Sequence, residues 1–148
     1  MAAALPPGVT PGAIYRHTRF YRDETTGELL PKYLTVLAAL RGGDVVFRLL
    51  TSRPHGRREN PPCSHGDPYP RFYLGVLGSP LTEKSWLDLR GSEDFESGEF
   101  RAELSGKILE PVARLNGRML RAAMECAAAA TDTTYAQEQA IRDRLACL

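Results

Sequence analysis

The apolar positions divide the first fifty residues into short segments separated by polar turns. Residues 13–18 (AIYRHT) combine β-branched and aromatic side chains, and a polar segment over 22–28 follows them. This pattern predicts a strand and a turn. The apolar run 33–40 and the segment 45–50 lie on either side of Arg-Gly-Gly-Asp at 41–44. Two apolar runs separated by such a turn predict a β-hairpin.

The middle of the chain repeats this arrangement. Residues 72–77 and 84–89 predict a second strand pair around the Gly-Ser-Pro sequence at 78–80. An acidic stretch over 93–103 follows, and residues 107–115 predict one more strand.

The end of the chain has helical periodicity instead. Asn116 is a good N-cap, and the apolar residues Leu120, Ala123, Met124 and Ala127 recur at helical spacing, which predicts a helix over 117–130. Thr134 and Gln137 fit a capping box for a last helix over 133–147. Several short strands followed by two helices predict a mainly β domain, a small and strongly curved antiparallel barrel with a helix packed on it. The Ala- and Pro-rich residues 1–11 are expected to form a flexible leader.

Composition sets limits on this picture. The chain has 148 residues, of which 43% are hydrophobic and 25% charged, as in an ordinary soluble single-domain protein. No apolar run approaches the roughly 20 residues that span a bilayer, and the N-terminus does not resemble a secretory signal. The net charge of +1 conceals a charge of +4 on residues 1–71 and −3 on residues 72–148. This asymmetry allows a basic working surface on the first half.

The three cysteines, Cys63, Cys126 and Cys147, are odd in number and widely spaced. We therefore expect no disulfide framework and a reducing, cytoplasmic setting. A metal site formed by His55, Cys63 and His65 is disfavoured, because one residue between Cys63 and His65 is too tight a spacing and no fourth ligand is evident.

The segment 53–70 holds five prolines and two glycines, which excludes a helix or a central strand. This segment contains a cluster of basic residues and one aromatic residue, namely Arg53, His55, Arg57, Arg58 and Tyr69. Such a mixture suits single-stranded nucleic acid, with the cations on phosphates and the rings stacked on bases. The alternative is a solvent-exposed loop stiffened by proline.

Five short motifs, in order, resemble the MazF/PemK (Kid-like) toxin family of bacterial toxin–antitoxin pairs. They are Gly12-Ala13-Ile14-Tyr15, Lys32-Tyr33-Leu34-Thr35-Val36-Leu37, Leu50-Thr51-Ser52, Leu87-Asp88 and Ala113-Arg114-Leu115-Asn116. The resemblance covers roughly residues 12–130. It implies an SH3-like antiparallel barrel over that range, with 131–148 as an additional C-terminal helix.

The sequence departs from the family pattern in three places. Lys32 and Tyr33 stand where the family usually has Arg and Pro, the segment 53–70 is longer than the usual loop, and the final helix is an addition. Lysine offers phosphate a point charge, whereas arginine offers a planar two-pronged donor.

The resemblance implies a homodimer that cleaves single-stranded RNA without a metal or other cofactor, inhibits growth, and is neutralised by a protein antitoxin. In that chemistry the 2′-hydroxyl of the RNA attacks the adjacent phosphate. Lys32 would supply the cation and Thr51 a hydroxyl donor, supported by Ser52, and Arg53 would restore a guanidinium. Asp88, or Glu24 or Glu28 in the first turn, would accept the proton.

Structural alternatives stand beside each of these roles. Thr51 and Ser52 fit a turn cap, Asp88 fits an ion pair with Arg90, and Lys32 fits a solvated edge-strand lysine. His17 lies either on the barrel surface or facing the site. The competing function is a non-catalytic barrel that binds RNA or a protein partner, and a gyrase-poisoning relative is disfavoured because its aromatic tail is lacking here.

Overall fold

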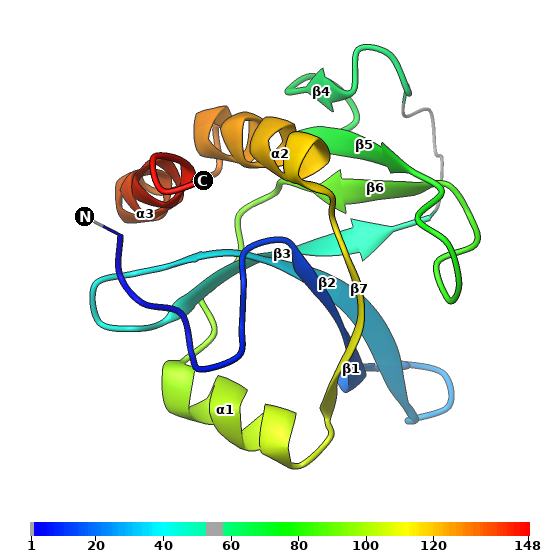
Figure 1. The fold of residues 1–148 in the computed structure, drawn as a ribbon. Coiled ribbons are helices and arrows are strands. Elements are labelled where there is room, and N and C mark those ends of the chain that lie inside the picture. The colour runs from blue at the N-terminus through cyan, green and yellow to red at the C-terminus, as the bar shows by residue number, and fades with distance from the viewer. Residues whose placement is uncertain (1, 53–57) are drawn as a thin grey trace.

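A computed structural model describes residues 2–52 and 58–148. Seven strands form one antiparallel sheet, and two of the three helices follow the last strand (Figure 1). The strands are β1 (Ala13–Arg22), β2 (Leu29–Ala39), β3 (Val45–Thr51), β4 (Cys63–Ser64), β5 (Arg71–Gly75), β6 (Ser85–Asp88) and β7 (Leu109–Arg114). The helices are α1 (Ser97–Ser105), α2 (Gly117–Ala129) and α3 (Tyr135–Leu145).

The strand order is β4-β5-β6-β3-β2-β1-β7, with β4 and β7 at the edges. The two predicted strand pairs, β2 with β3 and β5 with β6, are confirmed, as is a mainly β fold with C-terminal helices. In the part of the chain that the structure describes, hydrogen bonding does not join β4 to β7, so strand pairing leaves the sheet open.

Strands β1 and β2 are longer than predicted. Their hairpin continues through polar positions, with Arg22 opposite Leu29. The turn is held by Asp23, whose Oδ1 accepts hydrogen bonds from the backbone N–H groups of Thr25 and Thr26 at 2.7 and 3.1 Å. This local Asx-type turn fixes the register of the hairpin tip.

Each face of the sheet has its own hydrophobic core, because successive side chains of a strand point to opposite faces. On β3, Val46 and Leu50 belong to the core under α2 and α3, whereas Val45 and Phe47 belong to the core under α1. Figure 1 shows α2 and α3 on one side and α1 on the other.

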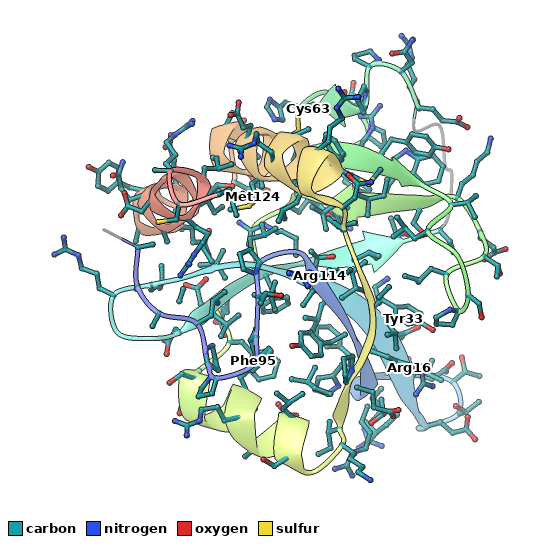
Figure 2. The ribbon with its side chains drawn as sticks, in the orientation of Figure 1. Arg16, Tyr33, Cys63, Phe95, Arg114 and Met124 are labelled. Atoms are coloured by element: carbon teal, nitrogen blue, oxygen red, sulfur yellow. A yellow bond between two sulfur atoms is a disulfide. The ribbon has the colours of Figure 1, made fainter. Side chains whose placement is uncertain are left out.

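The predicted apolar stripe of α2 is buried in the first core: Leu120 is 6% exposed, and Ala123, Met124 and Ala127 are fully buried (Met124 is labelled in Figure 2). Asn116 caps this helix by accepting a hydrogen bond from the backbone N–H of Met119 at 2.9 Å. The capping box of α3 is also present, and Ile141 is its buried apolar anchor.

Helix α1 lies in the acidic stretch, where no helix was predicted. Its N-cap is Glu96, whose carboxylate accepts hydrogen bonds from the backbone N–H groups of Gly98 and Glu99. Phe100 is its only buried residue, and the ring packs edge-on against Tyr15 and Phe95, at centroid distances of 5.6 and 5.2 Å (Phe95 is labelled in Figure 2).

The first residues contact the domain, although they were predicted to form a flexible leader. Val9 is 6% exposed in the core under α1. Arg144 of α3 donates a hydrogen bond from Nη2 to the carbonyl oxygen of Ala3 at 2.6 Å. Gly12 has a φ of +88° and donates its backbone N–H to the carbonyl oxygen of Val36 at 2.8 Å. Because L side chains rarely adopt that φ, glycine suits the turn into β1.

The expectation of no disulfide is wrong in this structure. Cys63 of β4 is bonded to Cys126 of α2, and Cys147 is a free, exposed thiol. The pairing was not evident from the sequence because 63 positions separate the two cysteines, and β4 itself lies inside the segment that was predicted to be loop throughout.

Candidate functional site

Lys32 and Thr51 lie near the ends of two neighbouring strands. The pairing of β2 with β3 ends at Leu34 opposite Leu49, and Lys32 and Thr51 each lie two residues beyond this pair. On the other side of each strand, Lys32 lies opposite His17 of β1, and Thr51 lies opposite Trp86 of β6. Paired residues in an antiparallel sheet point to the same face. Lys32 therefore shares a face of the sheet with His17, and Thr51 shares one with Trp86.

A pocket of about 360 Å³ opens at this end of the sheet. Its polar lining includes Lys32, Thr51 and Ser52, and the loop between β5 and β6 closes it with Pro80, Thr82 and Glu83. Lys32 and Thr51 are half-buried, whereas Ser52 and Glu83 are exposed. The pocket thus combines one cation, several hydroxyl groups and one carboxylate.

Asp88 does not line this pocket. It lies opposite Leu49, two pairs further along β3 and β6 than Thr51 and Trp86, and lines a separate hollow with Arg90, Gly91 and Ser92. Its carboxylate forms an ion pair with Arg90 at 2.7 Å between Oδ2 and Nη2. This pairing raises the pKa of the Arg90 guanidinium, chiefly through the hydrogen bond to Asp88. The structure therefore places Asp88 in the ion pair with Arg90 that was weighed as its structural alternative.

Glu24 and Glu28 are both exposed in the turn between β1 and β2, and neither lines the pocket. The carboxylate that does line it, Glu83, was not predicted. No local sequence pattern pointed to Glu83, because the β5–β6 loop reaches the ends of β2 and β3 only through the folding of the sheet.

The predicted basic loop is described in part. Arg53, His55 and Arg57 lie outside the described residues. The carbonyl oxygen of Arg58 accepts a hydrogen bond from the indole Nε1 of Trp86 at 3.2 Å, so Trp86 of β6 holds this part of the loop. The guanidinium of Arg90 lies over the ring of Tyr69, with 4.0 Å between Cζ and the ring centroid. Tyr69 therefore lies beside the ion pair of Arg90 with Asp88.

His17 is buried rather than exposed on the surface. Its Nε2 lies 3.0 Å from Oε1 of Glu103 in α1, and its Nδ1 accepts the backbone N–H of Arg19 at 3.3 Å. The ring also packs edge-on against Phe20, with 5.4 Å between centroids. His17 therefore joins β1 to α1.

Among the described residues, two arginines are almost fully buried, which the sequence pattern did not predict. Arg48 is 1% exposed and donates hydrogen bonds to the carbonyl oxygen of Phe47 at 2.8 Å and to Oε1 of Gln137 at 3.1 Å. Burial lowers the pKa of Arg48, and the nearby carboxylates of Asp94, Asp88 and Asp132 oppose that effect. Arg71 is 2% exposed, and its Nη1 donates to the carbonyl oxygen of Asp67 at 2.6 Å, which ties the 66–69 loop to β5.

A second cluster of chemically active groups lies between the edge strand β4 and helix α2. It is formed by Cys63, His65 and Cys126, whose ligand atoms all lie within 4.8 Å of one another. The short spacing of Cys63 and His65 was visible in the sequence, but nothing there connected Cys126 with them.

No family model, curated protein or solved structure matches this chain. Within residues 2–52 and 58–148, no helix is long and apolar enough to cross a membrane.

Proposed function

We propose that this chain is an endoribonuclease of the MazF/PemK type, an SH3-like protein that cleaves single-stranded RNA without a metal. The observation that carries the proposal is the pocket in which Lys32, Thr51 and Ser52 lie together with Glu83. A cation, hydroxyl donors and a carboxylate are the groups that RNA transesterification requires. The motif resemblance supports the same reaction class, and three of its residues, Lys32, Thr51 and Ser52, line the pocket.

Glu83, Lys32 and Thr51 have different roles in the proposed reaction. Glu83 accepts the proton of the RNA 2′-hydroxyl, whose oxygen then forms a bond to the adjacent phosphorus. Lys32 and the hydroxyl of Thr51 stabilise the negative charge that develops on the phosphorane oxygens. The bond from phosphorus to the 5′-oxygen breaks, and that oxygen takes a proton from water. The products are a 2′,3′-cyclic phosphate and a free 5′-hydroxyl.

Aromatic residues beside the pocket provide a surface for the RNA bases. Tyr73 lies opposite Trp86, and their ring centroids are 5.1 Å apart. Tyr73 is half-buried, whereas Trp86 is buried beneath it. A base that stacks on the exposed part of the Tyr73 ring would lie next to the phosphate that Lys32 holds.

The proposal includes a cytoplasmic homodimer and a protein antitoxin. The apolar stripe of α2 is buried inside the chain, so the dimer surface has to lie elsewhere. Tyr21 and Leu29, which are 47% and 43% exposed at the tip of the β1–β2 hairpin, offer apolar area for it. Light scattering that gives a monomer mass at micromolar concentration would rule out the homodimer.

The test is cleavage of a labelled single-stranded RNA in the presence of EDTA, using protein with its disulfide intact. We expect products that end in a 2′,3′-cyclic phosphate. Lys32→Gln should lower the single-turnover rate by about 10²–10³-fold, because it removes one charge from the transition state. Lys107→Gln is the matched control, since Lys107 is exposed after α1 and does not line the pocket. It should leave the rate unchanged.

A non-catalytic RNA-binding domain is the second candidate, and one observation favours it. Asp88, the carboxylate of the family motif, is held by Arg90 and lies outside the pocket. If the purified protein cuts no RNA but binds it with an affinity that falls steeply with salt, this second function is correct and the nuclease is excluded.

A further inference from the structure

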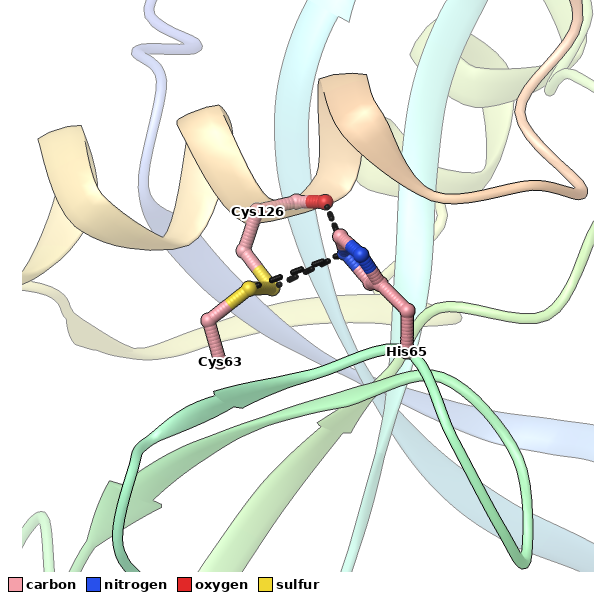
Figure 3. Close-up of side chains that lie close together, drawn as sticks. All are labelled: Cys63, His65 and Cys126. Atoms are coloured by element: carbon pink, nitrogen blue, oxygen red, sulfur yellow. Dashed lines mark hydrogen bonds between the residues drawn. A yellow bond between two sulfur atoms is a disulfide. The ribbon is translucent and has the colours of Figure 1, made fainter.

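The cluster of Cys63, His65 and Cys126 is formed by three residues that do not line the proposed RNA pocket. Cys63 lies on the edge strand β4, His65 follows that strand, and Cys126 lies in the last turn of α2 (Figure 3). Nε2 of His65 lies 3.6 Å from Sγ of Cys63 and 3.5 Å from Sγ of Cys126. One imidazole nitrogen therefore faces both sulfur atoms.

We propose that these three residues form a redox-controlled zinc site. With the cysteines reduced, two thiolates and one imidazole bind a single Zn²⁺. With the cysteines oxidised, the disulfide seen here occupies the same place without metal. Two thiolates and one imidazole are a ligand set that zinc favours.

The geometry of the cluster agrees with tetrahedral zinc. Zinc binds sulfur at about 2.3 Å and imidazole nitrogen at about 2.0–2.1 Å, so the sulfur–nitrogen edge of the tetrahedron is about 3.6 Å long. Both measured sulfur–nitrogen distances, 3.6 and 3.5 Å, match this edge. Only the two sulfur atoms have to separate, to about 3.8 Å, once their bond is broken. Cys63 can make that movement because it is half-buried on a two-residue strand at the sheet edge.

The helix end also favours a cation at this position. Nε2 of His65 lies 3.0 Å from the carbonyl oxygen of Cys126, which is one of the last carbonyls of α2. The C-terminal end of a helix carries partial negative charge and stabilises a nearby positive ion. In the disulfide form Nε2 donates a hydrogen to this oxygen. In the zinc form the proton moves to Nδ1, and the lone pair of Nε2 binds the metal. His65 is exposed, so water can solvate Nδ1–H.

The interconversion balances in electrons and protons. A dithiol reductant gives two electrons and two protons to the disulfide, and is itself converted to a disulfide. Zinc binding then releases the two thiol protons, since the thiolate is the ligand. A small-molecule disulfide reverses the change: it takes two electrons from the two thiolates and two protons from water, leaves as two thiols, and the zinc departs. Among the described residues the cluster has three protein ligands, and water fills the fourth position.

Cobalt titration of the full-length protein tests this proposal directly. Protein reduced with a phosphine under nitrogen should bind one Co²⁺ per chain, and should show the intense visible bands of tetrahedral cobalt and a thiolate-to-cobalt charge-transfer band. Zinc should displace the cobalt. The oxidised protein should show neither feature. Equal cobalt binding by the oxidised protein, or binding without a thiolate band, would overturn the proposal.

Single substitutions identify the ligands. Cys63→Ser should abolish the thiolate spectrum of a two-sulfur site, and His65→Ala should weaken zinc binding by at least about tenfold. Cys147→Ser is the matched control, because Cys147 is the free, exposed thiol, and it should bind as the unchanged protein does. Should Cys63→Ser fail to fold, the comparison of reduced with oxidised unchanged protein still decides the question. Unaltered zinc affinity in His65→Ala would exclude His65 as a ligand and the proposed site with it.

Discussion

Arg90 holds the carboxylate of Asp88 with two nitrogen atoms, Nε at 3.1 Å from Oδ1 and Nη2 at 2.7 Å from Oδ2. The backbone N–H of Arg90 also donates to Oδ1 at 3.0 Å, so the turn that follows β6 is closed around this carboxylate. The side chain of Asp88 is 13% exposed and that of Arg90 is 57% exposed. Asp88 therefore serves to shape the turn, and under the proposed function the proton acceptor has to be another residue.

The first prediction concerns which carboxylate supports cleavage. Glu83→Gln should lower the single-turnover rate of RNA cleavage by about 10²–10⁴-fold, since it removes the general base from the pocket. Asp88→Asn should keep the rate within a few-fold, because Asp88 lies outside the pocket. The opposite ranking, with Asp88→Asn inactive and Glu83→Gln active, would show that Asp88 acts as the base after leaving Arg90.

The second prediction concerns the disulfide. Cys63 and Cys126 close a loop of 63 positions. In the chain-entropy model, a cross-link over such a loop stabilises the folded state by about 4 kcal/mol. Reduction with a phosphine should therefore lower the free energy of unfolding by up to that amount in urea denaturation. Cys147→Ser should show the same drop on reduction, because Cys147 takes no part in the bond. An identical urea midpoint before and after reduction would contradict the prediction.

Much of the fold followed from local pattern. The stripe Leu120, Ala123, Met124 and Ala127 defined α2 and its buried face, and the hairpin of β2 and β3 followed from the Arg-Gly-Gly-Asp turn between two apolar runs. In both cases residues that are close together in the sequence are sufficient to predict the element. Periodicity shows which face is buried, and turn residues fix where the chain reverses.

Helix α1 was not predicted, because its sequence has no apolar periodicity that would show a buried face. Only Phe100 among its nine residues is buried, and its cap is a glutamate instead of the favoured serine, threonine, aspartate or asparagine. Tyr15, Phe95 and the His17–Glu103 contact hold it against the sheet. These contacts link residues up to 86 positions apart, which no local pattern shows.

The candidate site was predictable only where strand ends determine it. Lys32 precedes the predicted apolar run 33–40 and Thr51 follows the predicted segment 45–50, and in the structure both residues line one pocket. Glu83 and Cys126 could not be assigned, because each reaches its cluster through the path of the whole sheet.

The third prediction concerns the buried contact between His17 and Glu103. The two side chains are 10% and 18% exposed, and they join β1 to α1. Glu103→Ala leaves the buried imidazole without its partner, which should lower the free energy of unfolding by about 1–3 kcal/mol. Thermal and urea denaturation measure the change.

An exposed ion pair between the neighbouring strands β1 and β7 serves as the control for this measurement. Arg16 and Glu110 lie 3.9 Å apart with side chains that are 37% and 49% exposed (Arg16 is labelled in Figure 2). Because exposed ion pairs contribute little, Glu110→Ala should change the free energy of unfolding by less than about 1 kcal/mol. Equal losses in the two variants would show that the His17 contact has no special structural role.

The last prediction concerns the pH dependence that Asp94 confers. Partial burial raises the pKa of Asp94, and repulsion from Asp44 adds to this, whereas a hydrogen bond from Gln137 and the charge of Arg48 oppose it. The folded protein thus binds this proton more tightly than the unfolded chain does. Stability contributed by this group is therefore greatest in acid and falls as the pH rises through the raised pKa.

Asp94→Asn isolates this effect, because the asparagine amide oxygen can still accept the 2.9 Å hydrogen bond from Nε2 of Gln137 but does not titrate. We expect the free energy of unfolding of the unchanged protein, minus that of the variant, to decrease as the pH is raised above about 4, the ordinary aspartate value. Urea denaturation at a series of pH values measures this difference. If it increases with pH instead, ionised Asp94 stabilises the fold, and its attraction to the buried Arg48 outweighs the loss of solvation.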